Sequence, residues 1–261
     1  MVRSLPIYVI NLARRPDRLA VIAERLAAAG LSFERIDAVD AQSTPDEAID
    51  PHFSAGSGFG RVAKGDRCCT LSHLRFFERL VASRDDYALV LEDDAVFDGA
   101  ALRRVLDTNW LPPEVDLVKI EAYGGVGRKI LVGPQQRCLP GLSIARLHSR
   151  HTGTGGYIIS RALAAWLLSE AKPLSVPIDH LLFNPQLSPV FERIRPYQLL
   201  PTLVRQFDFK VDSDIDHWRI PYRQFSVEFV KRELWRFATD VRALPQQVAQ
   251  LAFGNWRFVS V

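Results

Sequence analysis

Three consecutive acidic residues, Glu92, Asp93 and Asp94, are the group in this sequence with the clearest chemical potential. They follow the apolar run 87–91, which is typical of a buried strand. Extended backbone sends alternate side chains to opposite sides, so we expect Glu92 and Asp94 on one side and Asp93 on the other. Two carboxylates on one side repel each other and favour a hard divalent cation such as Mg²⁺ or Mn²⁺. A solvated acidic turn before the next helix would explain the same triplet equally well.

The position of the triplet suggests which chemistry a cation there would serve. In an open α/β sheet, ligands bind beyond the carboxyl ends of the strands. A metal held at such an end can neutralise a diphosphate leaving group. The residues alone therefore favour metal-assisted phosphate chemistry without excluding the structural explanation.

Hydrophobic patterning predicts alternating strands and helices around the triplet. Further strands are expected at 7–11, 33–36, 116–120, 142–147 and 156–159, and helices at 16–29, 71–81, 161–171 and 178–183. The polar, glycine-containing segment 41–67 predicts a long loop. Because strand, helix and strand succeed one another within 7–36, a βαβ unit is expected. The sequence thus predicts an α/β fold with a mostly parallel central sheet.

Composition excludes several classes of protein. The 261 residues carry a net charge of +3 and are 48% hydrophobic, which is ordinary for a globular chain and argues against disorder. No apolar run approaches the ~18–20 residues of a membrane span, and the N-terminal pattern does not resemble a secretory signal. Three cysteines without a CxxC pair predict reduced thiols and a cytoplasmic location. The mildly basic balance comes with no nucleic-acid-binding module, so no nucleic acid partner is expected.

The C-terminal segment 217–261 differs in character from the rest of the chain. It holds seven Lys and Arg against three acidic residues, with aromatic residues interleaved. We expect a main domain over 1–216 and a basic, aromatic, helical extension over 217–261. The extension could lie against an anionic membrane surface. Alternatively, it could pack its aromatic side chains on the main domain and leave its charges in water.

Several short motifs occur in a fixed order along the chain. They are YVINL at 8–12, RRPDR at 14–18, AVD at 38–40, CTLSH at 69–73, LEDD at 91–94, GT at 153–154, YIIS at 157–160, IDH at 178–180 and SDI at 213–215. Together they resemble glycosyltransferase family 25, of the lipooligosaccharide β-galactosyltransferase type, over roughly residues 6–216. Each motif alone would be unremarkable.

That resemblance implies a GT-A-like, nucleotide-sugar-binding fold and an inverting glycosyltransferase. The donor would be a UDP-sugar, with galactose the expected hexose, and the acceptor a hydroxyl of a lipopolysaccharide or another surface glycan at the cytoplasmic face of a bacterial membrane. A DxD-like acidic motif would meet the diphosphate through Mn²⁺ or Mg²⁺. By resemblance, Glu92 and Asp94 would hold the metal, and Asp93 would contact ribose or sugar.

The same resemblance suggests where the nucleotide would bind. Asn11, Arg15 and Arg18 follow the first expected strand, where such a sheet receives the nucleotide. Arginines there can neutralise phosphate through forked hydrogen bonds, although a solvated helix start explains them equally well. Asp37 and Ala38, at the end of the second strand, are candidate contacts for uridine or ribose.

Three further positions complete the expected site. His73 would orient the donor or pack beneath it, and Thr154 lies in the glycine-rich segment 153–156, which allows backbone to approach a ligand closely. Asp179, in the first turn of an expected helix, is the candidate general base for the acceptor hydroxyl, with His180 a weaker alternative. An acid at that position can also simply stabilise the helix.

Two residues depart from the family pattern. Gly155 stands where the family commonly has a larger residue, and Cys68 where it usually has glycine. A rival explanation is a catalytically silent, sugar-nucleotide-binding scaffold protein in glycan assembly, because function resides in sites placed on folds. The intact triplet argues against that rival.

Overall fold

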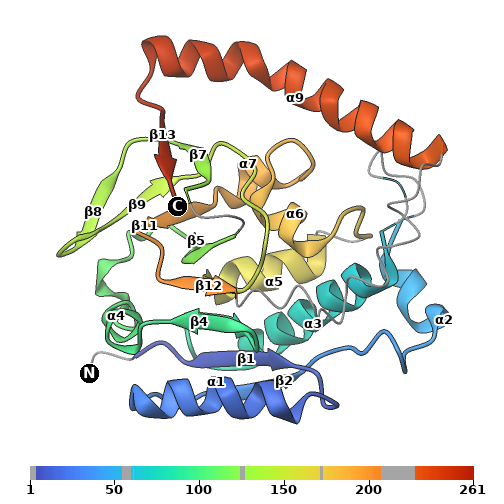
Figure 1. Cartoon of the computed structure of the whole chain (residues 1–261), viewed down its shortest axis with the longest axis vertical. Coiled ribbons are helices and arrows are strands. Elements are labelled where there is room, and N and C mark those ends of the chain that lie inside the picture. The colour runs from blue at the N-terminus through green and yellow to red at the C-terminus, as the bar shows by residue number, and fades with distance from the viewer. Residues whose placement is uncertain (1–3, 55–59, 61, 124–126, 171–172, 207–226) are drawn as a thin grey trace.

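A mixed β-sheet with helices on both faces forms the body of the protein (Figure 1). The computed structural model describes residues 4–54, 60, 62–123, 127–170, 173–206 and 227–261. The strands are β1 (Ile7–Asn11), β2 (Glu34–Asp37), β3 (Tyr87–Glu92), β4 (Ala95–Phe97), β5 (Leu117–Lys119), β6 (Glu121–Ala122), β7 (Lys129–Val132), β8 (Gln136–Leu139), β9 (Leu142–Arg146), β10 (Gly156–Ser160), β11 (Tyr197–Leu200), β12 (Val204–Gln206) and β13 (Arg257–Ser260). The helices are α1 (Pro16–Ala28), α2 (Asp46–Ile49), α3 (Lys64–Val81), α4 (Gly99–Arg104), α5 (Arg161–Glu170), α6 (Ile178–Phe183), α7 (Phe191–Ile194) and α9 (Val227–Phe253), with 3₁₀ turns η1 (Asp50–His52) and η2 (Thr108–Trp110).

The main sheet has eight strands in the order β2-β1-β3-β10-β5-β11-β9-β8. The expected βαβ unit is confirmed, because β1 and β2 pair in parallel and α1 joins them. The expectation of a mostly parallel sheet is wrong: β1–β2, β1–β3 and β5–β11 are parallel, and the other four pairs are antiparallel.

Strand β10 shows why the sheet is mixed. Gly156, its first residue, pairs with Leu91 near the end of β3, and Ser160, its last, pairs with Tyr87 at the start of β3. The chain therefore enters β10 from the edge at which β3 ends. This direction brings the segment before β10 directly beside the acidic triplet.

Strand β3 does not end in open solvent after the triplet. The chain turns at Asp93 and Asp94 and continues as β4, which joins β12 and β6 in a three-stranded sheet. Residues from β3, β6 and β12 are thereby gathered around one turn. This small sheet had no clear signal in the sequence, since its strands are only two or three residues long.

Helix α3 begins earlier than expected, at Lys64, inside the segment predicted to be a loop. Short helical turns, α2 and η1, occupy another part of that segment. One face of α3 is almost continuously buried, from Arg67 to Leu80, where it packs against α5 and the sheet. The tertiary contacts override the polar composition that predicted a loop.

Two apolar clusters lie on opposite faces of the sheet. One gathers α3, α5 and α6 around fully buried residues such as Phe77 and Phe183. The other gathers α1 and α4 around residues such as Ile22 and Leu102. The sheet is thus held between two helical layers, which fixes the strand ends rigidly.

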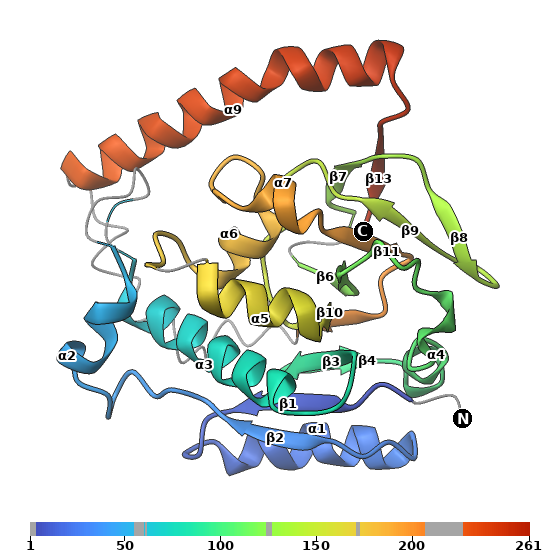
Figure 2. The same ribbon diagram turned by 180° about the vertical axis from the view of Figure 1, so that it is seen from behind.

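The C-terminal helix α9 runs along the side of the molecule opposite α1 (Figures 1 and 2). After α9, strand β13 pairs antiparallel with β7, so the end of the chain returns to the main body. The expected domain boundary at 216 and 217 lies outside the described residues. Within the described residues, no helix is long and apolar enough to cross a membrane.

Candidate functional site

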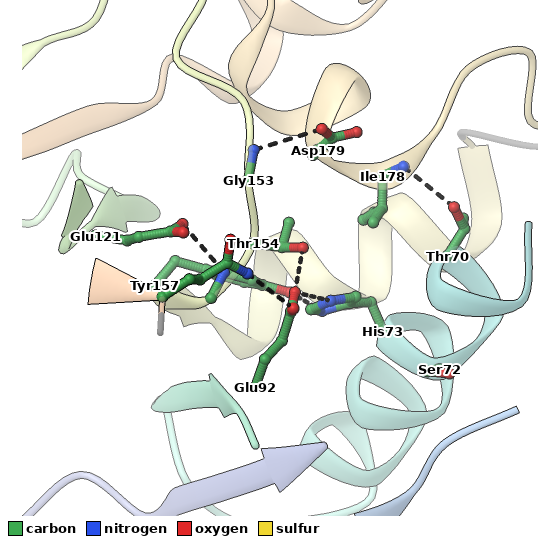
Figure 3. A network of polar contacts seen from close by, with 12 residues as sticks. Thr70, Ser72, His73, Glu92, Glu121, Gly153, Thr154, Tyr157, Ile178 and Asp179 are labelled. Atoms are coloured by element: carbon green, nitrogen blue, oxygen red, sulfur yellow. Dashed lines mark hydrogen bonds and ion pairs between the residues drawn. The ribbon is translucent and has the colours of Figure 1, made fainter. Parts of the chain in front are cut away.

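Glu92, the last residue of β3, is held by side chains from three other elements (Figure 3). Its Oε1 accepts a 2.5 Å hydrogen bond from Thr154 Oγ1 and lies 3.4 Å from Nε2 of His73. Its Oε2 accepts from Gln206 Nε2 at 3.1 Å. The sequence-predicted residues Glu92, His73 and Thr154 therefore meet in one place.

These contacts decide the charge of Glu92. Burial alone would raise its pKa, but the hydrogen bonds from His73 and Thr154 and the charge of Lys119 outweigh burial and hold the pKa below its usual value. Glu92 is therefore a carboxylate at neutral pH. Because that carboxylate has no proton, Nε2 of His73 is the donor in their contact, and Nδ1 of the same ring lies 2.8 Å from the Tyr157 hydroxyl.

Asp93 lies in the turn that follows β3, and it points to a different group of residues from Glu92. Its Oδ2 accepts from Asn11 Nδ2 at 2.7 Å, and its Oδ1 lies 3.6 Å from Arg18. Asn11 ends β1 and is itself fixed, since its Oδ1 accepts from Arg35. Burial raises the pKa of Asp93, and the contacts with Asn11 and Arg18 offset part of that rise. Three of the predicted nucleotide-site residues thus cluster at the end of β1.

Asp94 follows Asp93 in the turn after β3, and charges from both groups act on it. Its Oδ1 is buried and has no hydrogen-bond partner in the part of the chain that the structure describes. Burial raises its pKa well above the usual value, and the neighbouring charges of Glu92, Asp93 and Glu121 raise it further. A divalent cation would supply both the missing partner and the missing positive charge. The oxygen donor set fits Mg²⁺ or Mn²⁺.

Glu121 in β6 belongs to this site and was not predicted from the sequence. It is fully buried, and its Oε2 contacts Lys119 Nζ at 2.6 Å and accepts from the Gly155 amide at 3.0 Å. Its Oε1 is a second buried carboxylate oxygen without a hydrogen-bond partner among the described residues. The sequence held no local signal for this role, because Lys119 ends β5 and Glu121 begins β6, a two-residue strand of another sheet.

Lys119 and Glu121 together hold the segment that carries Thr154. Lys119 donates to the Gly153 carbonyl, while Glu121 accepts from the amide of Gly155. Lys119 is fully buried and lies 4.6 Å from the ring centroid of Phe183. The buried ion pair thus fixes the backbone on both sides of Thr154, the residue that contacts Glu92.

The glycines at 153 and 155 are explained by the protein's own packing. Gly153 has φ +93°, and a Cβ there would lie 2.7 Å from the ring of Tyr123. A Cβ on Gly155 would lie 2.8 Å from Gln206 Cγ and 2.9 Å from Glu121 Oε1. The departure from the family pattern at Gly155 therefore goes with close contact between this backbone, β6 and β12.

Asp179, the candidate base, lies in the first turn of helix α6. It is on the other side of the segment 153–155 from Glu92 (Figure 3). Its Oδ2 accepts a long, 3.4 Å hydrogen bond from the Gly153 amide, and its Oδ1 accepts from the His180 amide at 2.8 Å. Figure 3 shows Gly153 and Thr154 between Asp179 and Glu92. His180 instead contacts Asn184, through its Nδ1.

The remaining predicted residues lie around the end of β1 but face other partners. Arg15 pairs with Asp17 at 2.8 Å, which lowers the pKa of Asp17 to about 2. Asp37 is 69% exposed and pairs with Arg35, and the Ala38 amide donates to the Asn11 carbonyl. The structure places these residues near the ends of β1 and β2, and the charge of Arg15 acts to lower the pKa of Asp93.

A second set of metal-binding atoms overlaps the first. Cys69 Sγ, a ring nitrogen of His73 and a carboxylate oxygen of Glu92 lie within 4.8 Å of one another. This mixed set suits softer ions such as Zn²⁺. However, both ring nitrogens of His73 already face other groups, Tyr157 and Glu92, whereas the Asp94 oxygen has no hydrogen-bond partner among the described residues. The geometry therefore favours Asp94 as the centre of a cation site.

The sequence also matches a known family over most of this region. The family described as "Glycosyltransferase family 25 (LPS biosynthesis protein)" matches residues 4–182, which contain β1 to β10, the triplet and Asp179. The fold and the site define an α/β protein with clustered carboxylates at the end of a central strand. The chain belongs to glycosyltransferase family 25.

Individual relatives agree with this assignment. A "Glycosyltransferase 25 family member" of Aedes aegypti is 31% identical over 68% of this chain and 31% of its own length. The lacto-N-neotetraose biosynthesis glycosyltransferase LgtE of Neisseria gonorrhoeae is 27% identical over 62% of this chain and 59% of its own. LgtB of the same organism is 26% identical over 68% of this chain and 66% of its own. The match thus spans from about a third to two thirds of these relatives.

A solved structure also overlaps the chain. The crystal structure of a glycosyltransferase involved in the glycosylation of the major capsid of PBCV-1 aligns with a TM-score of 0.41 and 11% identity. The alignment covers 83% of this chain and 98% of that one. An overlap at that TM-score does not establish a shared fold.

Proposed function

We propose that this protein is an inverting glycosyltransferase of GT-A-like architecture that transfers a hexose, galactose in the first instance, from a UDP-sugar to a hydroxyl of a lipopolysaccharide or another surface glycan. The observation that carries the proposal is the buried carboxylate oxygen of Asp94 without a hydrogen-bond partner, at the end of β3. Family membership and the names of the Neisseria relatives support the substrate class.

In this proposal Asp94 and Glu92 hold Mn²⁺ or Mg²⁺, and Glu121 adds negative charge beside them. The cation would act as a Lewis acid on the departing diphosphate. Thr154 and Gln206 keep the Glu92 carboxylate in a fixed orientation through their hydrogen bonds. This fixed orientation reduces the reorganisation that ligand binding would otherwise require.

Residues at the end of β1 would receive the nucleotide. Arg18 and Arg15 lie where they can face phosphate, and Asn11 links this group to the triplet through Asp93. Asp37 and Ala38 lie at the neighbouring strand end and are proposed contacts of the uridine or ribose. His73 acts beneath the donor, because its ring is buried and orients Glu92.

Asp179 is the proposed general base. An inverting displacement requires a base that removes the proton of the acceptor hydroxyl as its oxygen attacks the anomeric carbon. The new glycosidic bond forms as the bond to the UDP oxygen breaks, and the proton moves to the Asp179 carboxylate. Hydrogen bonds from two backbone amides, of Gly153 and His180, hold this carboxylate in place and support the proposal.

We also propose that the protein acts at the cytoplasmic face of a membrane, with peripheral contact to anionic lipid. A lipid-linked acceptor would be presented there. The basic, aromatic composition of residues 217–261 supports such contact.

Release of UDP from a panel of UDP-sugars, with and without Mn²⁺, tests the proposal. We expect metal-dependent release with UDP-galactose, and loss of release in Asp94→Asn. The matched control is Asp86→Asn, which changes an 83% exposed carboxylate just before the other end of β3 and should leave release unchanged. Tight UDP binding without turnover for every donor and acceptor would instead identify a silent scaffold protein.

A further inference from the structure

Exposed apolar side chains are concentrated on helix α9. Of the ten large apolar side chains that are exposed in the described part of the chain, eight lie on this helix, so the exposure is a patch rather than scatter. Seven of them recur at alternating spacings of four and three residues. They are Val230, Leu234, Phe237, Val241, Leu244, Val248 and Leu251, here called the outer stripe.

The outer stripe faces away from the protein. The half-buried positions of α9 include Thr239, Ala243, Gln247 and Gln250, which form a polar or small face at the same helical spacing. Trp235 is the large residue of α9 that packs on the core. A helix in a globular protein normally buries its apolar face, so this arrangement is inverted and leaves apolar area in water.

A basic groove adjoins one flank of the outer stripe. It has a volume of about 240 Å³, and its lining includes Arg128, Lys129, Arg150, Asp240, Leu244 and Phe258. Three cations against one carboxylate give this groove a net positive charge. Leu244 belongs to the outer stripe, and Phe258 of β13 is 57% exposed beside it. Apolar and cationic surface therefore lie side by side.

We propose that α9 lies flat on an anionic bilayer, with the outer stripe among the acyl chains and the basic groove against lipid phosphates. The inference rests on the membrane contact in the proposed function and names the surface that makes it. Burial of apolar side chains and attraction of cations to anionic lipid act together in helices of this kind.

A second copy of the chain is the alternative partner for the outer stripe, because alternating spacings of four and three residues are also those of a coiled coil. In such a pair, Glu233 and Asp240 would flank the seam. In an antiparallel pair, these two acidic residues would face the acidic residues of the second copy. In a parallel pair, they would face Ala238 and Pro245. Neither arrangement therefore forms ion pairs. Pro245 also removes one hydrogen bond from the middle of α9. Both observations favour a bilayer.

Co-sedimentation of the full chain with vesicles tests this proposal. We expect binding to phosphatidylcholine vesicles that contain phosphatidylglycerol, and much weaker binding to pure phosphatidylcholine. Phe237→Asp/Val241→Asp should weaken binding to the anionic vesicles at least tenfold. Val21→Asp is the matched control, because Val21 and Val241 are both 44% exposed and Val21 lies on α1, at the opposite side of the molecule.

The vesicle assay contains neither metal nor donor, so its outcome is independent of the UDP-release assay. Equal binding by the double variant and the control, or no binding by the unchanged protein, would overturn the proposal. A dimer in solution that Phe237→Asp/Val241→Asp dissociates, without vesicle binding by the unchanged protein, would assign the outer stripe to a second copy. UDP release should be the same in Val241→Asp as in the unchanged protein.

Discussion

At the scale of single residues, the site is defined by a buried carboxylate oxygen that receives no hydrogen bond from the described residues. Asp94 is buried beside other carboxylates, and its Oδ1 accepts no hydrogen bond from the described residues. Such an arrangement costs stability in the absence of a cation and so is typical of a binding site rather than of a structural turn.

This cost gives a prediction for Asp94→Asn. Removing the charge relieves repulsion with Glu92 and Glu121, so the metal-free variant should be at least as stable as the unchanged protein. Thermal unfolding without divalent metal measures this, and Asp86→Asn is the control. A clear loss of stability, above about 1 kcal/mol, would show that Asp94 is a structural residue.

His151 gives a prediction for pH. It is fully buried, and its Nδ1 contacts Gln198 while its Nε2 accepts from the Tyr123 amide. Burial and the charge of Lys119 lower its pKa to about 3. In the unfolded chain the histidine pKa is near 6.5, so below that pH the unfolded chain binds a proton that the folded chain does not bind. The stability of the fold therefore falls as pH decreases from about 6.5 toward 3.

The expected size of this effect is about 1 kcal/mol of unfolding free energy between pH 7.5 and 5.5. Urea unfolding at both pH values measures it. His151→Asn should lose this part of the pH dependence, whatever its absolute stability. An unchanged pH dependence in that variant would show that other groups cause it.

Only part of this site could be predicted from the sequence, and the reason is physical. Glu92, Asp93 and Asp94 are adjacent and follow an apolar run, so the sequence predicted that they lie at the end of a strand. Glu121 and Gln206 reach Glu92 and Asp94 from strands far along the chain, where single polar residues carry no local signal. Their roles depend on strand pairing, which only the fold supplies.

At the scale of elements, the antiparallel entry of β10 places the segment 153–155 against the triplet. Parallel pairing, which the sequence favoured, would have put this segment at the opposite edge of the sheet. The local pattern of 156–159 correctly predicted a strand but could not predict its direction, since an apolar run looks the same in either orientation. The short strands β4, β6 and β12 were missed because a two- or three-residue strand shows no period.

The Lys119–Glu121 ion pair gives a prediction at this scale. Glu121→Leu leaves Lys119 buried without its partner and should cost about 3–5 kcal/mol of stability. Lys119→Met/Glu121→Leu removes both charges and should cost less than the single change. Chemical denaturation of both variants measures the difference. A double variant that is less stable than the single one would mean that the two charges act separately.

At the scale of the whole molecule, the acidic triplet and helix α9 have different proposed roles. The ends of β1 and β3 carry carboxylates and arginines at the proposed nucleotide site, while α9 leaves apolar side chains exposed. The composition of 217–261 predicted a distinct segment, but only the structure shows that Trp235 packs inward while the outer stripe faces out.

Two forces should therefore contribute to membrane contact, and salt separates them. At about 1 M salt, where the Debye length is ~3 Å, the attraction between the basic groove and anionic lipid should be screened. Vesicle binding should weaken but persist, because burial of the outer stripe does not depend on charge. Complete release at high salt would show that the apolar side chains do not enter the bilayer.

The most direct test of the proposed site is the equilibrium binding of Mn²⁺ to the full chain, followed by the electron paramagnetic resonance of the free ion, with and without UDP. We predict that UDP tightens Mn²⁺ binding, that Asp94→Asn weakens the UDP-dependent binding at least tenfold, and that Asp86→Asn does not change it. Undiminished, UDP-dependent Mn²⁺ binding in a folded Asp94→Asn variant would contradict a cation site at the end of β3.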